Sequence, residues 1–183
     1  ENESPAVWAM SGNSTEKVST TAIDNVLGGL SSDDLSSVYG WAYGEMGHYF
    51  IGFTLPDTCF VFDTVTTRWH ERKSLVVTAL GVTESTTCRA RSFSTAYGSL
   101  YVTDSQDGRI GIASRDTYKE YDNYIVRIAT TQPFQNNMEP FFVPMIELTI
   151  ESGVGNSDDE APMIRLQISR DGGKTWDYER ARA

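Results

Sequence analysis

Cysteine, histidine and long apolar runs are scarce in this chain of 183 residues, and each scarcity excludes a class of protein. Its two cysteines, Cys59 and Cys88, have no CxxC spacing. The sequence therefore predicts neither a zinc site nor a disulfide scaffold, but two free thiols of a protein made in a reducing cytoplasm. No window approaches the roughly 18 apolar residues of a membrane-spanning helix. The first residues, ENESP, lack the features of a signal peptide and an initiator methionine, so we expect a processed or excised piece.

The few candidate ligands and nucleophiles do not form a catalytic pattern. His48 and Cys59 could contact a metal, but a third and a fourth ligand are missing. His70 and Glu71 could act as an acid–base pair, yet no nucleophile stands at a recognisable spacing from them. The acidic run 158–160 lacks the ligand spacing of an EF-hand, which favours a solvated loop. We therefore expect no catalytic residue, no metal site and no cofactor, and we predict that the chain is not an enzyme.

Basic residues are outnumbered by acidic ones, 15 to 25, which gives a net charge of -10. An acidic surface repels phosphates, and this argues against broad binding to the phosphates of nucleic acid and to anionic membranes. We also expect no sequence-specific binding of nucleic acid. Hydrophobic residues make up 39% of the chain, which is enough for a globular core. The length suits one domain, or one domain and part of another.

Most of the chain consists of short aromatic and β-branched runs separated by turn residues, a pattern typical of strands. Helical signals are confined to an insert at about residues 19–46, where Ser and Thr caps precede apolar residues at helical spacing. The sequence thus predicts an all-β fold of β-propeller-like blades with a short helical segment near the N-terminus. We expect residues 1–183 to form a single domain of this kind or a fragment of one, a partial propeller. The predicted strands include 6–10, 48–55, 59–62, 68–73, 90–97, 100–104 and 109–112.

Two of these segments resemble each other. FVFDTVTTRW begins at Phe60 and LYVTDSQDGRIGI begins at Leu100, so the chain holds a weak internal repeat of about 40 residues. That period lies within the range of propeller blades. Asp63 and Thr64 lie in the turn of the first segment, whereas Asp104 and Asp107 flank the turn of the second and are interpreted as turn formers.

A hairpin with an Asp-box is predicted at residues 163–178. Ile164, Leu166 and Ile168 alternate with polar residues, which indicates a half-buried strand. The turn that follows has the S-x-D-x-G-x-T-W pattern of an Asp-box, in which side-chain oxygens accept hydrogen bonds from turn amides and glycine adopts a positive φ. Its Trp is expected to be buried between neighbouring sheets. The five structural residues of this Asp-box are Ser169, Asp171, Gly173, Thr175 and Trp176.

A second alternating run precedes this hairpin. Ile146, Leu148 and Ile150 alternate with polar residues. We expect this run to form a strand that pairs antiparallel with the first strand of the hairpin, although the loop between them is long.

Several segments together resemble the packaged-DNA stabilisation (tail hub) proteins of short-tailed, P22-like phages. The resemblance covers most of the chain, from about Val7 to Trp176. The segments that carry it are VSTTAIDNVL from Val18, GHYFIGFTLP from Gly47, VFDTVTTRWHER from Val61, TIESGVG from Thr149 and PMIRLQISRDGGKTW from Pro162. The chain departs from the family in length, because the family proteins are much longer and have blades before and after this region.

The resemblance implies a structural virion protein of the tail hub that joins the tail to the head–tail connector and helps to retain packaged DNA. Its partners would be other tail and portal or adaptor proteins, in a homo-oligomeric ring in the virion, assembled in the host cytoplasm and without contact to a membrane. Basic residues around the hairpin form a possible contact patch of Arg165, Arg170, Lys174 and Arg180, for which a solvated face is the simpler interpretation.

The alternative function is that of a glycan-acting or glycan-binding Asp-box propeller of the sialidase-like kind. A single Asp-box and the lack of an F/Y-R-I-P segment weigh against it.

Overall fold

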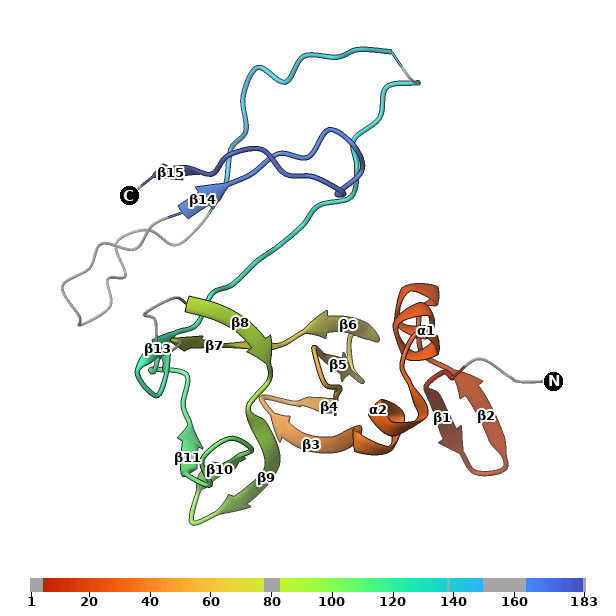
Figure 1. The fold of residues 1–183 in the computed structure, drawn as a ribbon, viewed down its shortest axis with the longest axis vertical. Helices are drawn as coiled ribbons and strands as arrows, with labels where there is room; N and C mark the ends of the chain where they lie inside the picture. The colour runs from red at the N-terminus through yellow and green to blue at the C-terminus, as the bar shows by residue number, and fades with distance from the viewer. Residues whose placement is uncertain (1–4, 78–82, 138, 150–163, 183) are drawn as a thin grey trace. The chain divides into compact units, whose positions relative to one another are not determined.

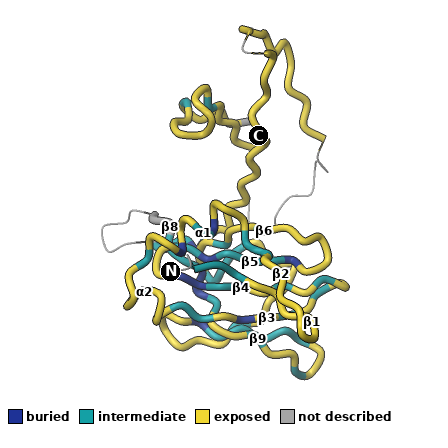
Figure 2. The backbone as a smooth tube through the Cα atoms, turned by 90° about the vertical axis from the view of Figure 1, so that its right-hand side faces the viewer, coloured by how far each residue is buried: buried dark blue, intermediate teal, exposed yellow. Residues whose placement is uncertain are grey.

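The computed structural model describes residues 5–77, 83–137, 139–149 and 164–182, and it divides into two compact units, Glu1–Ile125 and Val126–Ala183. Strands dominate the first unit, which also contains both helices (Figure 1). Buried and half-buried residues concentrate in this unit, whereas the second unit is almost entirely exposed (Figure 2). The two units are described separately below.

The first unit begins with a hairpin and two short helices. Strands β1 (Trp8–Ser11) and β2 (Ser14–Lys17) pair antiparallel. Helix α1 (Thr21–Gly28) starts where the Thr20 hydroxyl accepts a hydrogen bond from the Ile23 amide. Helix α2 (Ser32–Ser37) starts at a capping box, in which Ser31 and Asp34 each accept a hydrogen bond from the other's backbone amide. Both helices lie within the insert predicted at about 19–46, but this range also contains the whole of the strand that follows, so its last part is not helical.

A four-stranded antiparallel sheet follows the helices, in the order β3 (Tyr39–Glu45), β4 (His48–Thr54), β5 (Cys59–Asp63) and β6 (Arg68–Glu71). A two-residue turn with positive φ at Met46 (49°) and Gly47 (80°) connects β3 to β4, and this turn matches the twist of a hairpin. Strand β5 is the most buried of the four, since its residues alternate between fully and partly buried. The regular up-and-down order is that of a propeller blade.

The rest of the first unit consists of smaller sheets. Strands β7 (Lys73–Val77) and β8 (Thr83–Thr87) form one hairpin. Strands β9 (Ala90–Ala96), β10 (Ser99–Asp104) and β11 (Ile110–Ala113) form a three-stranded antiparallel sheet. Strands β12 (Lys119–Glu120) and β13 (Asn123–Tyr124) form a short final pair.

Two apolar clusters hold these sheets together. The first lies between the four-stranded sheet and β9, where the Trp41 and Phe93 rings are 4.8 Å apart and Cys59, Val61 and Cys88 are buried. The second cluster packs α1 against the four-stranded sheet and contains Ile23, Leu27 and Leu55, with the partly buried Trp69 packed against it. The Trp69 indole also donates a hydrogen bond to the Val18 carbonyl, 2.8 Å away, which ties β6 to the chain before α1.

The second unit has little regular structure in its described residues. Strands β14 (Ile164–Leu166) and β15 (Arg180–Arg182) pair antiparallel, and residues 126–137 and 139–149 form neither helix nor strand. The prediction of a strand at Ile146 and Leu148 that pairs with β14 is therefore wrong for the residues described; Ile150 lies outside them. Strand β14 is exposed at all three positions, so the predicted half-burial is also wrong. Alternating apolar residues form a buried strand only where a second layer covers them.

The fold is all-β and partly propeller-like, with a short helical segment near the N-terminus. Within the described ranges, no helix is long and apolar enough to cross a membrane.

Candidate functional site

The end of strand β5 carries a buried, fully hydrogen-bonded carboxylate. Oδ1 of Asp63 accepts a hydrogen bond from the Val65 amide at 3.0 Å, and Oδ2 accepts one from the Thr66 hydroxyl at 2.7 Å. The His48 Nδ1 atom lies 2.8 Å from the same Oδ2. Burial on its own would raise the pKa of Asp63, but the hydrogen bonds from Thr66, Val65 and His48 outweigh it and lower that pKa to about 2.

The same arrangement recurs about 40 residues later, at the end of β10. Oδ1 of Asp104 accepts hydrogen bonds from the amides of Gln106 (2.6 Å) and Asp107 (3.4 Å), and Oδ2 lies 2.6 Å from Nη2 of Arg89. Arg89 immediately precedes β9, as His48 begins β4, so each turn carboxylate meets a basic side chain from the start of the neighbouring strand.

The two turns also share backbone geometry. Residue 67, a threonine with φ of 55°, and residue 108, a glycine with φ of 72°, occupy the same place in the two turns. The weak internal repeat seen in the sequence is thus a structural repeat of β4–β5–β6 by β9–β10–β11.

Arg89 is the centre of the second turn. Its side chain is 8% exposed and its guanidinium contacts Asp104, which is fully buried, and Asp107 at 3.0 Å. Its backbone amide donates to the Ser74 hydroxyl at 3.1 Å, and its carbonyl accepts from the Ser105 amide at 2.8 Å. Arg89 therefore connects β7, β9 and the β10–β11 turn.

Charges around Arg89 are balanced inside the network. The guanidinium of Arg109 lies over the Tyr121 ring at 3.9 Å and, through a hydrogen bond, lowers the pKa of Asp107 to about 2. Burial raises the pKa of Glu120, which lies in the same region. Arg89 Nε has no hydrogen-bond partner among the described residues. Asp104 Oδ2 lies within ion-pair distance of Arg89 Nη2, but the angle between them is not that of a hydrogen bond. A network whose acids and arginines face each other stabilises a turn and offers little to a charged ligand.

The Asp-box turn between β14 and β15 is held by side-chain oxygens. The Ser169 hydroxyl accepts from the Gly173 amide at 2.7 Å, and Oδ1 of Asp171 accepts from the amides of Lys174 (3.0 Å) and Thr175 (2.9 Å). The Thr175 hydroxyl donates to the other carboxylate oxygen at 2.5 Å. These bonds, led by the one from the Thr175 hydroxyl, lower the pKa of Asp171 to about 2. Glycine is required at Gly173, where φ is 90°.

Trp176 is 46% exposed within the described part of the chain. The expectation that its ring would be buried between neighbouring sheets is wrong for these residues, because the described part of the second unit contains no other sheet to cover it. The indole instead approaches the turn, where it lies 3.9 Å from the position that a Cβ atom on Gly173 would occupy.

The four residues of the possible contact patch are all exposed, but they differ in their partners. Arg165 Nη1 lies 3.2 Å from a Glu179 oxygen, and Arg180 Nη2 lies 3.9 Å from an Asp177 oxygen. Arg170 and Lys174, which flank Asp171 in the turn, make no ion pair with any residue that the structure describes. The net positive part of the patch is thus the tip of the hairpin.

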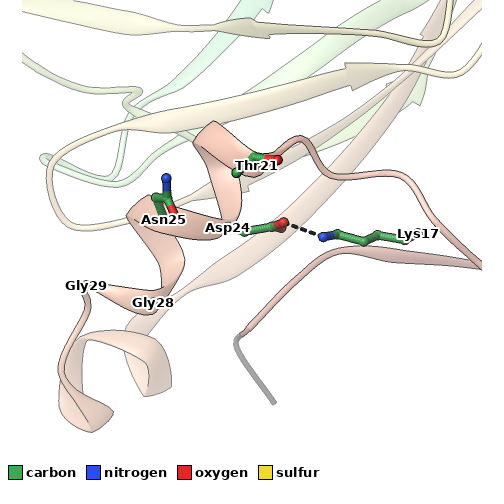
Figure 3. A pocket seen from close by; sticks show the side chains of 6 residues that line it. All are labelled: Lys17, Thr21, Asp24, Asn25, Gly28 and Gly29. Carbon is green, nitrogen blue, oxygen red and sulfur yellow. Dashed lines mark ion pairs between the residues drawn. The ribbon is translucent and has the colours of Figure 1, made fainter. Parts of the chain in front are cut away.

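A hollow on helix α1 opens to solvent (Figure 3). Lys17 and Asp24 face each other across it in an ion pair of 2.5 Å, and hydrogen bonding from Lys17 lowers the pKa of Asp24. The pair neutralises the two charged groups that line the hollow. Its lining consists of Lys17, Thr21, Asp24, Asn25, Gly28 and Gly29.

The other candidates from the sequence are not brought together into a site. His48 contacts Asp63, whereas Cys59 lies in the first apolar cluster. The ring of His70 accepts a hydrogen bond from Arg72 Nε at 3.2 Å, and burial, together with that charge, lowers the His70 pKa. Within the described ranges, no group of three or more metal-ligating side chains could hold an ion. The acidic run 158–160 lies outside the described residues.

Sequence reasoning missed the role of Arg89. A signal was present, since Arg89 follows His48 by the same interval as Asp104 follows Asp63. Aligning the two repeats position by position would have found the pair.

Comparison with protein-family models gives one match: residues 1–118 match the family described as "Bacteriophage P22 Gp10, beta-propeller". No curated protein and no solved structure matches the chain. The family match covers both structural repeats and ends before the Asp-box hairpin.

Proposed function

Because the chain belongs to the family of the bacteriophage P22 Gp10 β-propeller, we propose that it is a tail-hub protein that joins the tail to the head–tail connector. The family makes it a phage structural protein that stabilises packaged DNA. The proposal adds the place of action, the phage tail within the virion, and the partners, which are other tail and portal or adaptor proteins. It also adds the assembly, a homo-oligomeric ring formed in the host cytoplasm.

The family match over residues 1–118 is the observation that carries this proposal. Those residues hold the four-stranded sheet and the second structural repeat, which are the parts that resemble propeller blades. We propose that residues 1–183 form one propeller-like domain or a fragment of one, in which the hairpin at 163–178 is an Asp-box of structural role.

The charge of the chain indicates how such a protein would retain DNA. A subunit with a net charge of -10 repels the phosphate backbone, so it would act by contacts with other virion proteins and by obstructing the exit. Several of the described basic side chains are paired with acids, as Arg89 is with Asp104 and Arg165 is with Glu179. No sequence-specific reading of DNA is part of the proposal.

The hairpin tip is the surface that we propose for contact with an acidic virion partner. Arg170 and Lys174 flank Asp171, and the hydrogen bonds to Ser169 and Asp171 hold the backbone of the turn in one conformation. A rigid turn loses little conformational freedom on binding, which favours its use as a contact.

The test is co-sedimentation of the purified protein with filled phage heads that lack tails, with release of DNA measured in parallel. We expect the protein to sediment with the heads and to reduce DNA release. Absence of both effects would refute the tail-hub proposal for this chain. Binding assays on glycan arrays and a sialidase assay would then test the glycan-acting or glycan-binding alternative, which rests on the Asp-box pattern alone.

Two matched double variants separate the tip from the rest of the patch. Arg170→Ala with Lys174→Ala removes the two cations without an ion pair, and we expect weaker binding to heads. Arg165→Ala with Arg180→Ala removes the same number of charges from side chains that already face acids. Equal loss in the two variants would show that binding depends on total charge and not on the tip.

A further inference from the structure

The two cysteines belong to one core cluster although they lie far apart in the sequence. Cys59 lies in β5 and is fully buried, and Cys88 lies two residues before β9 and is 7% exposed. Both are free and both belong to the apolar cluster around Trp41. The Thr87 hydroxyl donates a hydrogen bond to the Thr58 carbonyl at 2.9 Å, which joins the two residues that directly precede the cysteines. The sequence predicts two unrelated thiols, because nothing in their spacing indicates that they touch.

The surroundings of the two sulfur atoms differ. The Thr54 hydroxyl, which accepts a hydrogen bond from the Trp41 indole at 3.0 Å, donates to Cys59 Sγ at 3.5 Å. The hydrogen bond from Cys88 is the main cause that lowers the pKa of Cys59; Thr54 and the positive charge of Arg72 act in the same direction. The hydrogen bond with Cys59 and burial raise the pKa of Cys88. Cys59 is therefore the better nucleophile of the pair, and Cys88 is placed to react second.

We propose that Cys59 and Cys88 are a redox pair in which a peroxide oxidises Cys59 and Cys88 then closes a disulfide between the two sheets. We name a peroxide as the oxidant because Cys59 is fully buried, and a molecule close to water in size reaches such a thiol more easily than a larger disulfide reagent does. The oxidation chemistry does not depend on the proposed tail-hub role. The time at which oxidation occurs does rest on that role, because a virion protein would be assembled with reduced thiols in the cytoplasm and would meet oxidants after release.

The two steps balance. The Cys59 thiolate attacks one peroxide oxygen, so that an S–O bond forms, the O–O bond breaks, and the hydroxide that leaves takes up a proton to become water. The sulfur of Cys88 then attacks the Cys59 sulfenic acid, so that the S–S bond forms and the S–O bond breaks with loss of a second water. The two sulfur atoms together lose two electrons and two protons, and one peroxide is reduced to two waters.

The disulfide would tie the middle of the first structural repeat, at the start of β5, to the chain just before the second repeat. It would close a loop of about 30 residues, and the loss of freedom in the unfolded chain is expected to raise the midpoint of thermal unfolding by roughly 10 °C. Trp41 lies in the same cluster, so its fluorescence would report closure directly.

The experiment treats the full chain with hydrogen peroxide under native conditions and follows intact mass, thiol alkylation and thermal unfolding. We expect a mass loss of about 2 Da, the disappearance of both alkylatable thiols in the denatured protein, and a higher midpoint that dithiothreitol reverses. Retention of both free thiols, or stepwise gain of oxygen without a disulfide, would overturn the proposal.

Single variants then test the order of the two steps. In Cys88→Ser the sulfenic acid on Cys59 has no resolving thiol, and we expect the native protein to gain the mass of one oxygen, about 16 Da. In Cys59→Ser the remaining Cys88 thiol lacks the Thr54 hydroxyl and the Arg72 charge that favour the thiolate of Cys59, and we expect at least about tenfold slower gain of oxygen. Equal rates in the two variants would contradict the assigned roles, and the measurements on the unmodified chain stand even if one variant fails to fold.

Discussion

Arg89→Met should destabilise the first unit by removing one cation from a buried ion-pair network. The methionine keeps much of the apolar stem that packs in the network, but it removes the guanidinium between Asp104 and Asp107. Asp104 is then a buried carboxylate without a cation, since its side chain is not exposed at all. Its remaining hydrogen bonds come from the amides of Gln106 and Asp107.

The size of the effect follows from that burial. Breaking a buried ion pair by removing one partner costs about 3–5 kcal/mol, mostly because the other charge stays buried and unpaired. Two amide hydrogen bonds still hold Asp104, so we expect the lower end, about 3 kcal/mol. A loss of that size moves the midpoint of urea unfolding down by about 1–2 M.

A control of the same chemistry stands two residues away. Arg91 is exposed on β9 and lies over the Tyr39 ring at 5.1 Å, so Arg91→Met should cost less than about 1 kcal/mol. Equilibrium unfolding in urea, followed by far-UV circular dichroism and tryptophan fluorescence, measures both variants. Equal midpoints for Arg89→Met and Arg91→Met would refute the reasoning.

A double-mutant cycle checks the cause of the loss. In Arg89→Met with Asp104→Asn the buried charge is absent, and the double variant should be more stable than the sum of the single losses by at least about 1 kcal/mol. Additive losses would show that Arg89 acts through packing and not through Asp104.

Three further predictions concern one residue each. In Gly52→Ala the new Cβ would overlap the Trp41 indole, and we expect the free energy of unfolding, measured in urea, to fall by about 1–3 kcal/mol. Gly40→Ala is the control, because a Cβ there would have only ordinary contacts. Equal unfolding midpoints for the two variants would contradict the overlap. Asp171→Ala removes the acceptor of the Asp-box turn, and amide hydrogen exchange should speed up in the turn while β3–β6 keep their protection; unchanged exchange would show that Asp171 is not needed. The pKa of Asp63 is lowered to about 2 in the folded chain, so the ionised carboxylate stabilises the fold fully above the unfolded pKa of 3.8, and this stabilisation is lost as the pH falls through 2. The stability of Asp63→Asn should therefore depend less on acid pH, and thermal unfolding of both proteins over a pH series measures this.

Turn chemistry is the part of this fold that could be predicted from sequence, because it is local. Asp63 and Asp104 accept hydrogen bonds from amides two residues on, and the same short pattern that encodes the turn also fixes where the flanking strands end. Asp171 in the second unit also accepts hydrogen bonds from turn amides, here three and four residues on. The strands around the first two turns lie close to their predicted positions for this reason.

The basic partners of the turn carboxylates could not be predicted in the same way. His48 and Arg89 reach Asp63 and Asp104 from the neighbouring strand, across 15 residues in each case. Which residue meets a turn depends on strand register, and register is set by the sheet as a whole. The contact between Cys59 and Cys88 belongs to the same class, since it arises from the packing of two sheets.

The wrong predictions share a physical cause. Alternation at Ile146 and Leu148 indicates a strand only if an edge is free to receive it and a layer covers its apolar face. The described second unit provides no such layer, and Trp176 and β14 remain exposed for the same reason. Periodicity reports what a segment could bury, and tertiary structure decides whether it does.

The arginines show how the fold and the proposed function fit together. Arg72 lies over the rings of Trp41 and Tyr43, at 5.5 and 5.3 Å, and donates to the Tyr43 hydroxyl at 2.7 Å. Arg89 is enclosed by acids. These two arginines are used inside the fold, and in a chain with fewer basic than acidic residues this leaves fewer cations for phosphates. The balance of charge supports our proposal that the chain acts on packaged DNA through contacts with other virion proteins.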